Sequence, residues 1–357
     1  MERRYVKQLN GDIRALCGNA LKLSFGEPGR FLFLAKTLIF QLKAAARRKK
    51  CAKEGLHVPA FMIFSVTNKC NLACKGCYVM AQGRGASSEI TSEKLTGILK
   101  EANELGISIT LVSGGEPLAR GGLLDILAGF PQALFALFTN GLLLDEISIE
   151  KLRKNRHIIP VISIEGGEAF TDSRRGGGTY SGVSTAYSKL KEKNIFFGTS
   201  ITVTSENYRH IFESGFIREA LSSGCGLFFF IEYIPVQEGT DKLILTSVQK
   251  EEIKRQVIEL QKKNRALFLS FPSGEDIYGG CLAAGRGFVH ISADGKLEPC
   301  PFSPYSDADL NKITLKEALN SRLLKTIREN HDKMKEPKGG CTLWENREWV
   351  AGLAGEK

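Results

Sequence analysis

Short apolar runs alternate with helical patterns through the middle of the chain. Between the runs, apolar residues return at helical spacing, as at Leu95, Leu99 and Ala102 behind the predicted cap Thr91. Nearly continuous apolar runs are typical of strands covered on both faces, as in a parallel sheet. The repeated strand–helix units predict an α/β fold, a partial (β/α)6 TIM-like barrel with its ligand site at the C-terminal ends of the strands. The six predicted strands are Phe61–Val66, Ile107–Val112, Leu134–Phe138, Ile158–Ile164, Phe196–Val203 and Leu227–Ile234.

The N-terminal segment has a different pattern. Residues 1–28 predict a short helical piece, and residues 30–53 predict one amphipathic helix. One interpretation is that this helix lies on an anionic membrane surface. The other is that it packs on the protein body and leaves its basic face in solvent. The apolar face comprises Phe31, Leu34, Ala35, Leu38, Ile39 and Leu42, and the opposite face carries Lys36, Lys43, Arg47 and Lys50.

The charge of the chain is concentrated in this segment. The 357 residues carry a net charge of +10, but residues 1–59 hold 13 Lys and Arg against 4 Asp and Glu. The chemistry of the core therefore needs no polyanionic partner, and we expect no nucleic acid to bind. Without a signal peptide or a run of ~18 apolar residues, the chain is predicted to be cytoplasmic. Attachment to the inner face of the membrane is the alternative that the basic helix raises.

Three segments are predicted. Residues 1–58 form the basic helical segment and residues 59–239 the partial barrel. After Pro235 the pattern changes to a polar helix over Ser247–Lys263 and Gly-rich stretches, so residues 240–357 are predicted to be a smaller C-terminal unit.

Three of the nine cysteines follow the first predicted strand closely, at Cys70, Cys74 and Cys77. Thiolates are soft ligands that suit iron–sulfur clusters or zinc. Three ligands leave one corner of a four-ligand site open for a substrate or cofactor. Zinc with a distant fourth ligand is the alternative. The odd number of cysteines argues against a framework of structural disulfides.

The thiol motif resembles that of the radical S-adenosylmethionine (radical SAM) superfamily. Cys70-x3-Cys74-x2-Cys77 is followed by the aromatic Tyr78, and Ser113-Gly114-Gly115-Glu116-Pro117 after the second strand is similar to the Gly-Gly-Glu motif of that family. Two glycines let the backbone approach a ligand, and a glutamate can pair with an ammonium group. Polar residues suited to contacting a nucleoside end the third and fourth strands, in Thr139-Asn140-Gly141 and Ser163-Ile164-Glu165-Gly166. The later Asp172-Ser173-Arg174-Arg175-Gly176 resembles an Asp-x-x-Arg-Gly segment of the same superfamily. Ordinary turn chemistry is the alternative for both strand ends, and Asn-Gly is common in turns.

The resemblance implies a cofactor and its chemistry. The three loop cysteines would hold a [4Fe–4S] cluster, and its fourth iron would chelate the amino and carboxylate groups of S-adenosylmethionine. Reductive cleavage would give a 5′-deoxyadenosyl radical that abstracts hydrogen from a substrate. A donor such as ferredoxin or flavodoxin would supply the electron. The residues implied in cofactor binding are Tyr78, Gly114, Gly115, Glu116, Pro117, Thr139, Asn140, Ser163, Glu165 and Arg175.

Three later cysteines resemble a second motif of that superfamily. Cys281, then Gly295-x4-Cys300, then Cys341 are similar to the auxiliary-cluster extensions called SPASM and twitch domains. A hairpin of Val289–Ser292 and Lys296–Glu298 around Asp294-Gly295 is expected between them. The resemblance implies one auxiliary iron–sulfur cluster, and the alternatives for its fourth ligand are Cys225, a non-cysteine side chain or the substrate itself. Structural cysteines or a zinc site are the alternatives.

Three functions follow from these observations. The first is a radical enzyme that acts on a peptide or a small metabolite. The second is the same chemistry on a membrane lipid or isoprenoid, suggested by the basic helix over residues 30–53. The third is a non-catalytic metal-binding protein that holds nucleic acid through its basic arm. The Gly114–Pro117 motif disfavours the third, because a binding module does not need it.

Overall fold

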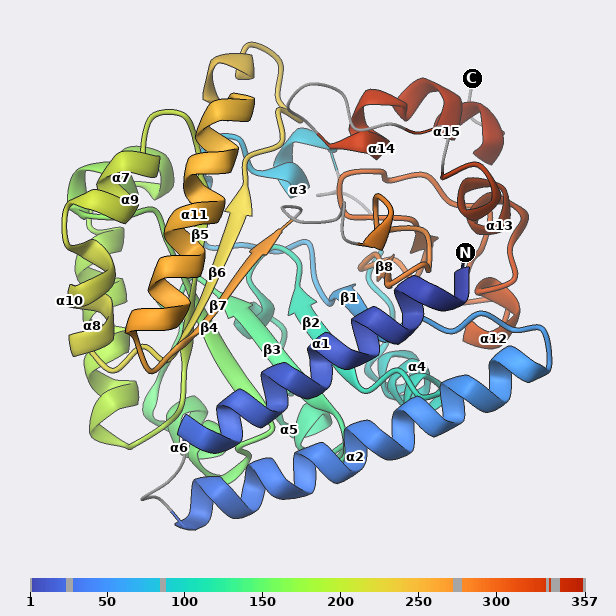
Figure 1. Cartoon of the computed structure of the whole chain (residues 1–357), viewed down its shortest axis with the longest axis horizontal. Coiled ribbons are helices and arrows are strands. Elements are labelled where there is room, and N and C mark those ends of the chain that lie inside the picture. Colours follow the sequence, from blue (N-terminus) through green and yellow to red (C-terminus); the bar gives the residue numbers. More distant parts are fainter. Residues whose placement is uncertain are drawn as a thin grey trace.

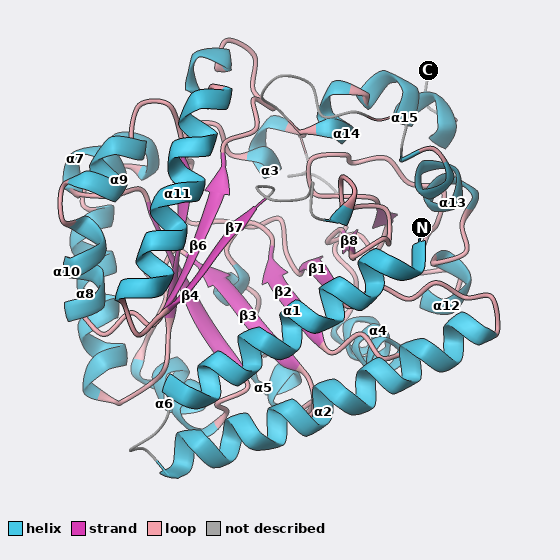
Figure 2. Ribbon diagram, viewed as in Figure 1, coloured by secondary structure: helices cyan, strands magenta, loops and turns pink. Residues whose placement is uncertain are grey.

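The computed structural model describes residues 2–23, 28–83, 88–271, 278–331, 334 and 341–355. In this part of the chain one curled sheet has helices packed around its outer face (Figures 1 and 2). Its strands lie in the order β7-β6-β5-β4-β3-β2-β1-β8-β9. The strands are β1 Phe61–Ser65, β2 Ile109–Ser113, β3 Leu134–Thr139, β4 Ile158–Ile164, β5 Gly198–Val203, β6 Leu227–Glu232, β7 Leu267–Phe271, β8 Phe288–Ile291 and β9 Leu297–Glu298.

The first seven strands are parallel, with the chain returning through a helical crossover each time. This confirms the α/β half-barrel and the six predicted strands. The helices are α1 Glu2–Leu23, α2 Pro28–Lys53, α3 Tyr78–Ala81, α4 Ser92–Leu105, α5 Leu123–Ala128, α6 Glu146–Lys154, α7 Glu168–Arg175, α8 Thr179–Glu192, α9 Tyr208–Glu213, α10 Phe216–Ser222, α11 Ser247–Lys263, α12 Leu315–Ala318, α13 Arg322–Glu329, α14 Thr342–Glu345 and α15 Arg347–Ala354.

Local chemistry sets the ends of these elements. Thr91 accepts a hydrogen bond from the Lys94 amide at the start of α4, and Gly106 ends that helix with a φ of 96°. The predicted polar helix over Ser247–Lys263 coincides with α11, whose N-cap Thr246 forms a capping box with Gln249.

The sheet continues beyond the six predicted strands. β7 extends it past β6, and β8 pairs in parallel with β1 before turning back into β9. The predicted hairpin around Asp294-Gly295 is therefore present, with Gly295 at a φ of 87°. β7 was not predicted from the sequence, because it is an edge strand of five residues that are mostly half-buried. The same sheet thus includes strands from both sides of the predicted boundary at residue 239.

The helix α2 crosses the end of the sheet where the strands begin (Figure 1). It packs on the body through a polar line rather than through its apolar face: Gln41 accepts from Ser108 Oγ at 2.7 Å, and Arg48 donates to the Gly106 carbonyl at 2.5 Å. Burial lowers the pKa of Arg48 to about 10. Arg47 donates to the Asn103 carbonyl at 2.7 Å, so both guanidiniums bind the C-terminal end of α4, where the helix dipole favours cations.

Candidate active site

The thiol loop, residues 67–77, leaves the C-terminal end of β1 and carries Cys70, Cys74 and Cys77. Cys70 is exposed and the other two are half-buried, and none forms a disulfide. Burial raises the pKa of the Cys70 and Cys74 thiols. Three free sulfurs thus stand on one loop at the edge of the sheet where the predicted site lies.

The Gly114-Gly115 turn after β2 holds this loop at its base. Gly115 N donates to the Thr67 carbonyl and Glu116 N to the Lys69 carbonyl, both at 2.7 Å. A Cβ on Gly114 would lie 2.3 Å from the Thr67 oxygen, and one on Gly115 would lie 2.2 Å from the Lys69 oxygen. Gly114 also has a φ of 136°. Only glycine permits this contact, so the two glycines bring the loop backbones together.

Two further contacts fasten the loop near its second and third cysteines. Lys75 N donates to the Arg174 carbonyl at the end of α7 at 2.9 Å. Gly76 N donates to Gln237 Oε1 at 2.9 Å, beyond β6. The thiol loop is therefore tied to the loops that follow β2, β4 and β6, which is what a rigid cofactor site requires.

Glu116 is buried and its carboxylate is turned into the protein. Oε1 accepts from Thr139 Oγ1 at 2.7 Å and from Leu118 N at 3.0 Å, while Oε2 accepts from Asn140 N at 2.7 Å. Burial raises its pKa, against these hydrogen bonds. An ionised carboxylate offers about four acceptor positions, so Oε2 keeps one for a ligand donor. Asn140 in turn donates to Asn71 of the thiol loop at 2.7 Å.

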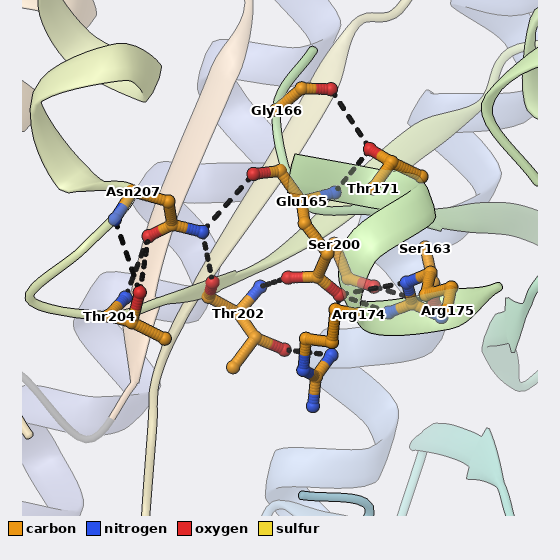
Figure 3. A network of polar contacts seen from close by, with 10 residues as sticks. All are labelled: Ser163, Glu165, Gly166, Thr171, Arg174, Arg175, Ser200, Thr202, Thr204 and Asn207. Carbon is orange, nitrogen blue, oxygen red and sulfur yellow. Dashed lines mark hydrogen bonds and ion pairs between the residues drawn. The ribbon is translucent and has the colours of Figure 1, made fainter. Parts of the chain in front are cut away.

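At the ends of β4 and β5, Glu165 organises a second cluster (Figure 3). Its Oε1 binds Arg174 Nη1 at 2.5 Å and Arg175 Nη2 at 2.6 Å, and its carboxylate is buried. Thr202 N donates to Oε2 at 3.2 Å. Burial lowers the pKa of Arg174, but the Glu165 carboxylate outweighs this and raises it overall. Two cations share one carboxylate, so the cluster keeps a positive charge for an anionic group.

This cluster lies close to the thiols. The positive charges of Arg175 and Arg174 oppose the effect of burial on the pKa of Cys74. The sequence reading chose Arg175 but missed Arg174, although the adjacent arginines at the end of one helix were the available signal. Asn207, also missed, donates to the Glu165 carbonyl at 3.1 Å and to the Thr202 carbonyl at 2.9 Å. Ser163 hydrogen-bonds to Ser200 Oγ at 3.0 Å on the neighbouring strand.

A buried polar chain runs below the thiol loop. His290 on β8 is fully buried, with Nε2 2.7 Å from Ser65 Oγ and Nδ1 2.7 Å from Glu298 Oε2. It joins the end of β1 to the β8–β9 hairpin. Sequence reasoning passed over it because a histidine in an apolar strand gives no motif.

Two of the later cysteines precede and follow this hairpin along the chain. Cys281 precedes β8 and is half-buried, Cys300 follows β9 and is buried, and Cys341 is buried at the N-terminus of α14. The segment after Cys300 contacts α3, since Pro301 O accepts from Gln82 at 2.9 Å and Phe302 packs edge-on against Tyr78 at 5.7 Å. Tyr78 thereby links the thiol loop to the segment with the later cysteines.

Within the described residues, no three His, Cys, Asp or Glu side chains converge on a point that suits a single metal ion. A cubane cluster has a different requirement, because each thiolate binds a separate iron. The donor set fits such a cluster: three thiols on one loop, beside glycines that let a ligand approach and near two arginines. The predicted residues after β1 to β5 therefore gather at one end of the sheet.

The chain is similar to several known proteins. Residues 64–214 match the model of the radical SAM superfamily. An AdoMet-dependent heme synthase of Methanosarcina barkeri is 25% identical over 325 residues, covering 83% of this chain and 91% of the relative. The PqqA peptide cyclase of Gluconobacter oxydans is 24% identical over 303 residues, covering 82% and 84%. The crystal structure of Streptococcus suis SuiB has the same fold at 17% identity, with a TM-score of 0.66 over 86% of this chain and 78% of that one. The radical SAM match over residues 64–214 and these relatives support a radical SAM enzyme that uses a [4Fe–4S] cluster and S-adenosylmethionine and has a C-terminal auxiliary extension.

Proposed function

We propose that this enzyme uses Cys70, Cys74 and Cys77 to hold the [4Fe–4S] cluster and acts on a peptide or a small metabolite. The observation that carries the proposal is the thiol loop seated directly on the Gly114-Gly115 turn, at the C-terminal end of the sheet. Cysteines with a purely structural role would not require the backbone of their loop to lie so close to a glycine turn.

Held by these three thiols, a bound cluster would supply the electron for reductive cleavage of S-adenosylmethionine, the chemistry that leads to hydrogen abstraction from the substrate. The residues of the chain bind and orient the cofactor. Glu116 Oε2 offers its remaining acceptor position to the amino group of S-adenosylmethionine, and Arg175 offers its guanidinium to the carboxylate. Thr139, Asn140 and Ser163 lie at the adjacent strand ends, where the nucleoside would contact them. Pro117 begins the short turn that fixes Glu116.

The barrel interior shields the reaction from water. Apolar side chains of the strands line it, among them Val161 and Phe229, and Phe138 packs edge-on against Phe229 at 5.1 Å. A dry interior keeps a reactive intermediate from side reactions.

The substrate class is inferred from relatives. The PqqA peptide cyclase matches most of this chain, and its name gives a peptide as substrate. The similar coverage by a heme synthase favours a small metabolite as the second candidate. The lipid hypothesis gains no support here, because α2 lies at the other end of the strands. We also propose that Cys281, Cys300 and Cys341 hold one auxiliary cluster, and that a low-potential donor such as ferredoxin or flavodoxin supplies electrons.

The test is formation of 5′-deoxyadenosine by the anaerobically reconstituted, reduced protein. We expect cleavage of S-adenosylmethionine that increases when an extract of the source cells is added. If protease treatment of the extract removes the increase, the substrate is a peptide; if the increase survives, it is a metabolite. Absence of any cleavage by a protein with a full complement of iron would contradict the proposal.

A further inference from the structure

The outward side of α2 presents apolar and basic side chains together. Leu32, Ile39 and Leu42 are 56%, 51% and 47% exposed, and Phe31 is also exposed. The described part of the chain exposes eleven large apolar residues. Four of them lie on α2, and no other described helix exposes four. We call this side of α2, with its exposed lysines, the outer face; the lysines are Lys36, Lys43, Lys49, Lys50 and Lys53.

The packing of α2 against the body fixes which side of the helix faces the solvent. The helix is held by its opposite side, where Thr37, Gln41, Ala44 and Arg48 are buried. Ser108 binds Gln41, and Asn10 and Gly106 bind Arg48 at 2.6 and 2.5 Å. At 100° per residue these contacts leave Ile39 and Lys43 pointing away from the body. The apolar residues therefore cannot turn inward without breaking buried polar contacts.

The sequence of α2 contains eight Lys and Arg and no Asp or Glu. Arg156 of the body lies beside Gly29, at the beginning of the helix, and adds another cation. An exposed face of this sign attracts an anionic partner.

We infer that the outer face of α2 docks the enzyme on an anionic membrane surface. The cations meet the lipid phosphates, and the leucine and isoleucine side chains enter the boundary between headgroups and acyl chains. A nucleic acid would use the cations but not the apolar residues. A second copy of the chain would place like charges against each other. Among the helices of the described residues, none is long and apolar enough to cross a membrane, and docking needs none.

The direction of docking follows from the strands. α2 contacts Gly106 and Ser108 immediately before β2, whereas the glycine turn and the thiol loop follow β2 (Figure 1). A protein docked by α2 therefore turns its candidate active site away from the lipid. Docking would place the enzyme at the membrane without feeding it lipid.

The experiment is flotation of the full-length protein with vesicles of phosphatidylcholine alone or mixed with phosphatidylglycerol. We expect flotation with the anionic vesicles only, weakened by salt. Lys36→Gln/Lys43→Gln/Lys50→Gln should weaken binding roughly 100-fold, because each cation near the surface contributes about five-fold. Ile39→Ser/Leu42→Ser should weaken it by at least about ten-fold.

Matched controls place the same changes elsewhere. Ile147→Ser/Val248→Ser removes two exposed apolar residues from other helices, and Lys100→Gln/Lys262→Gln/Lys316→Gln removes three other lysines. Both should float as the unaltered protein does, and all variants should melt at the same temperature. Equal binding to neutral vesicles, no binding, or equal loss in the controls would overturn the inference. So would a dimer without vesicles that Ile39→Ser/Leu42→Ser converts to monomer, because a second copy would then occupy the face.

Discussion

The two ends of the sheet use polar residues in opposite ways. Where the strands end, Glu116, Glu165 and Arg174 point inward and are bound by one another or by loop amides. Where the strands begin, Gln41 and Arg48 point inward only to fasten a helix, and the apolar residues of that helix face out. One end is therefore built to hold a polar ligand within the protein, and the other to present a surface. Variants should separate these two roles.

The largest effect is expected from Cys74→Ala. A protein with two clusters holds about eight irons, and loss of the core cluster leaves about four. Formation of 5′-deoxyadenosine should disappear, and electron paramagnetic resonance should lose the core signal. Iron analysis after anaerobic reconstitution measures this directly.

Two companions sharpen that result. Cys225→Ala is the matched control, because this buried thiol precedes β6, at the end of the sheet where the strands begin, and burial raises its pKa to about 12. Its iron content should equal that of the unaltered protein. Replacing Cys281, Cys300 and Cys341 by alanine should instead leave about four irons and the core signal. An iron content unchanged by the triple substitution would remove the auxiliary cluster from the proposal.

Gly115→Ala should have the next largest effect on the binding of S-adenosylmethionine. Its Cβ would stand 2.2 Å from the Lys69 carbonyl oxygen, so the thiol loop must move. We expect affinity for S-adenosylmethionine to fall at least about ten-fold, the equivalent of about 1.4 kcal/mol or more. The unfolding free energy should fall by about 1–3 kcal/mol.

The matched control is Gly97→Ala in α4, where nothing lies within 4 Å of the added Cβ. It should stabilise the helix by about 0.5–1 kcal/mol. Calorimetric titration with S-adenosylmethionine measures the affinity of both variants, and thermal melting measures their stability. Unaltered binding by Gly115→Ala would show that the loop does not depend on this approach.

The contrast between the ends also explains what the sequence could tell. Strand-like runs and the motifs after them predicted the half-barrel, because covered parallel strands need continuous apolar residues. The residues that form α2 were predicted as well, but not which side of the helix faces the body. Periodicity gives the faces of a helix, whereas Arg48 and Gln41 choose which face is buried through partners such as Gly106 and Ser108, more than 50 residues away.

The same limit applied to the site. The Gly-Gly-Glu and cysteine motifs are local, so they were visible. The chain of Ser65, His290 and Glu298 joins residues more than 220 positions apart, and only the parallel pairing of β1 with β8 brings them together. Contacts made by the tertiary fold leave no local pattern to read.

Glu165→Gln should lower the stability of the protein at the end of the sheet that holds the candidate active site. It leaves Arg174 and Arg175 without their shared anion, and breaking a buried ion pair costs about 3–5 kcal/mol. The variant should melt at a lower temperature, and binding of S-adenosylmethionine should weaken with it. Glu150→Gln, which also loses an arginine partner but on the surface, should melt like the unaltered protein. Equal melting of both variants would contradict the buried arrangement.

The smallest effect, and the clearest separation of the two ends, is expected from Arg48→Met. This change removes hydrogen bonds to the Gly106 carbonyl and Asn10 and leaves a buried acceptor unpaired, which costs about 1–3 kcal/mol. The neighbouring Lys49→Met changes an exposed cation and should not alter melting. Because α2 contacts the chain before β2 and the site lies after it, iron content and cleavage of S-adenosylmethionine should stay unchanged in both variants. If Arg48→Met lowered iron content as Cys74→Ala does, the two ends would be coupled through the sheet, and the separation drawn here would fail.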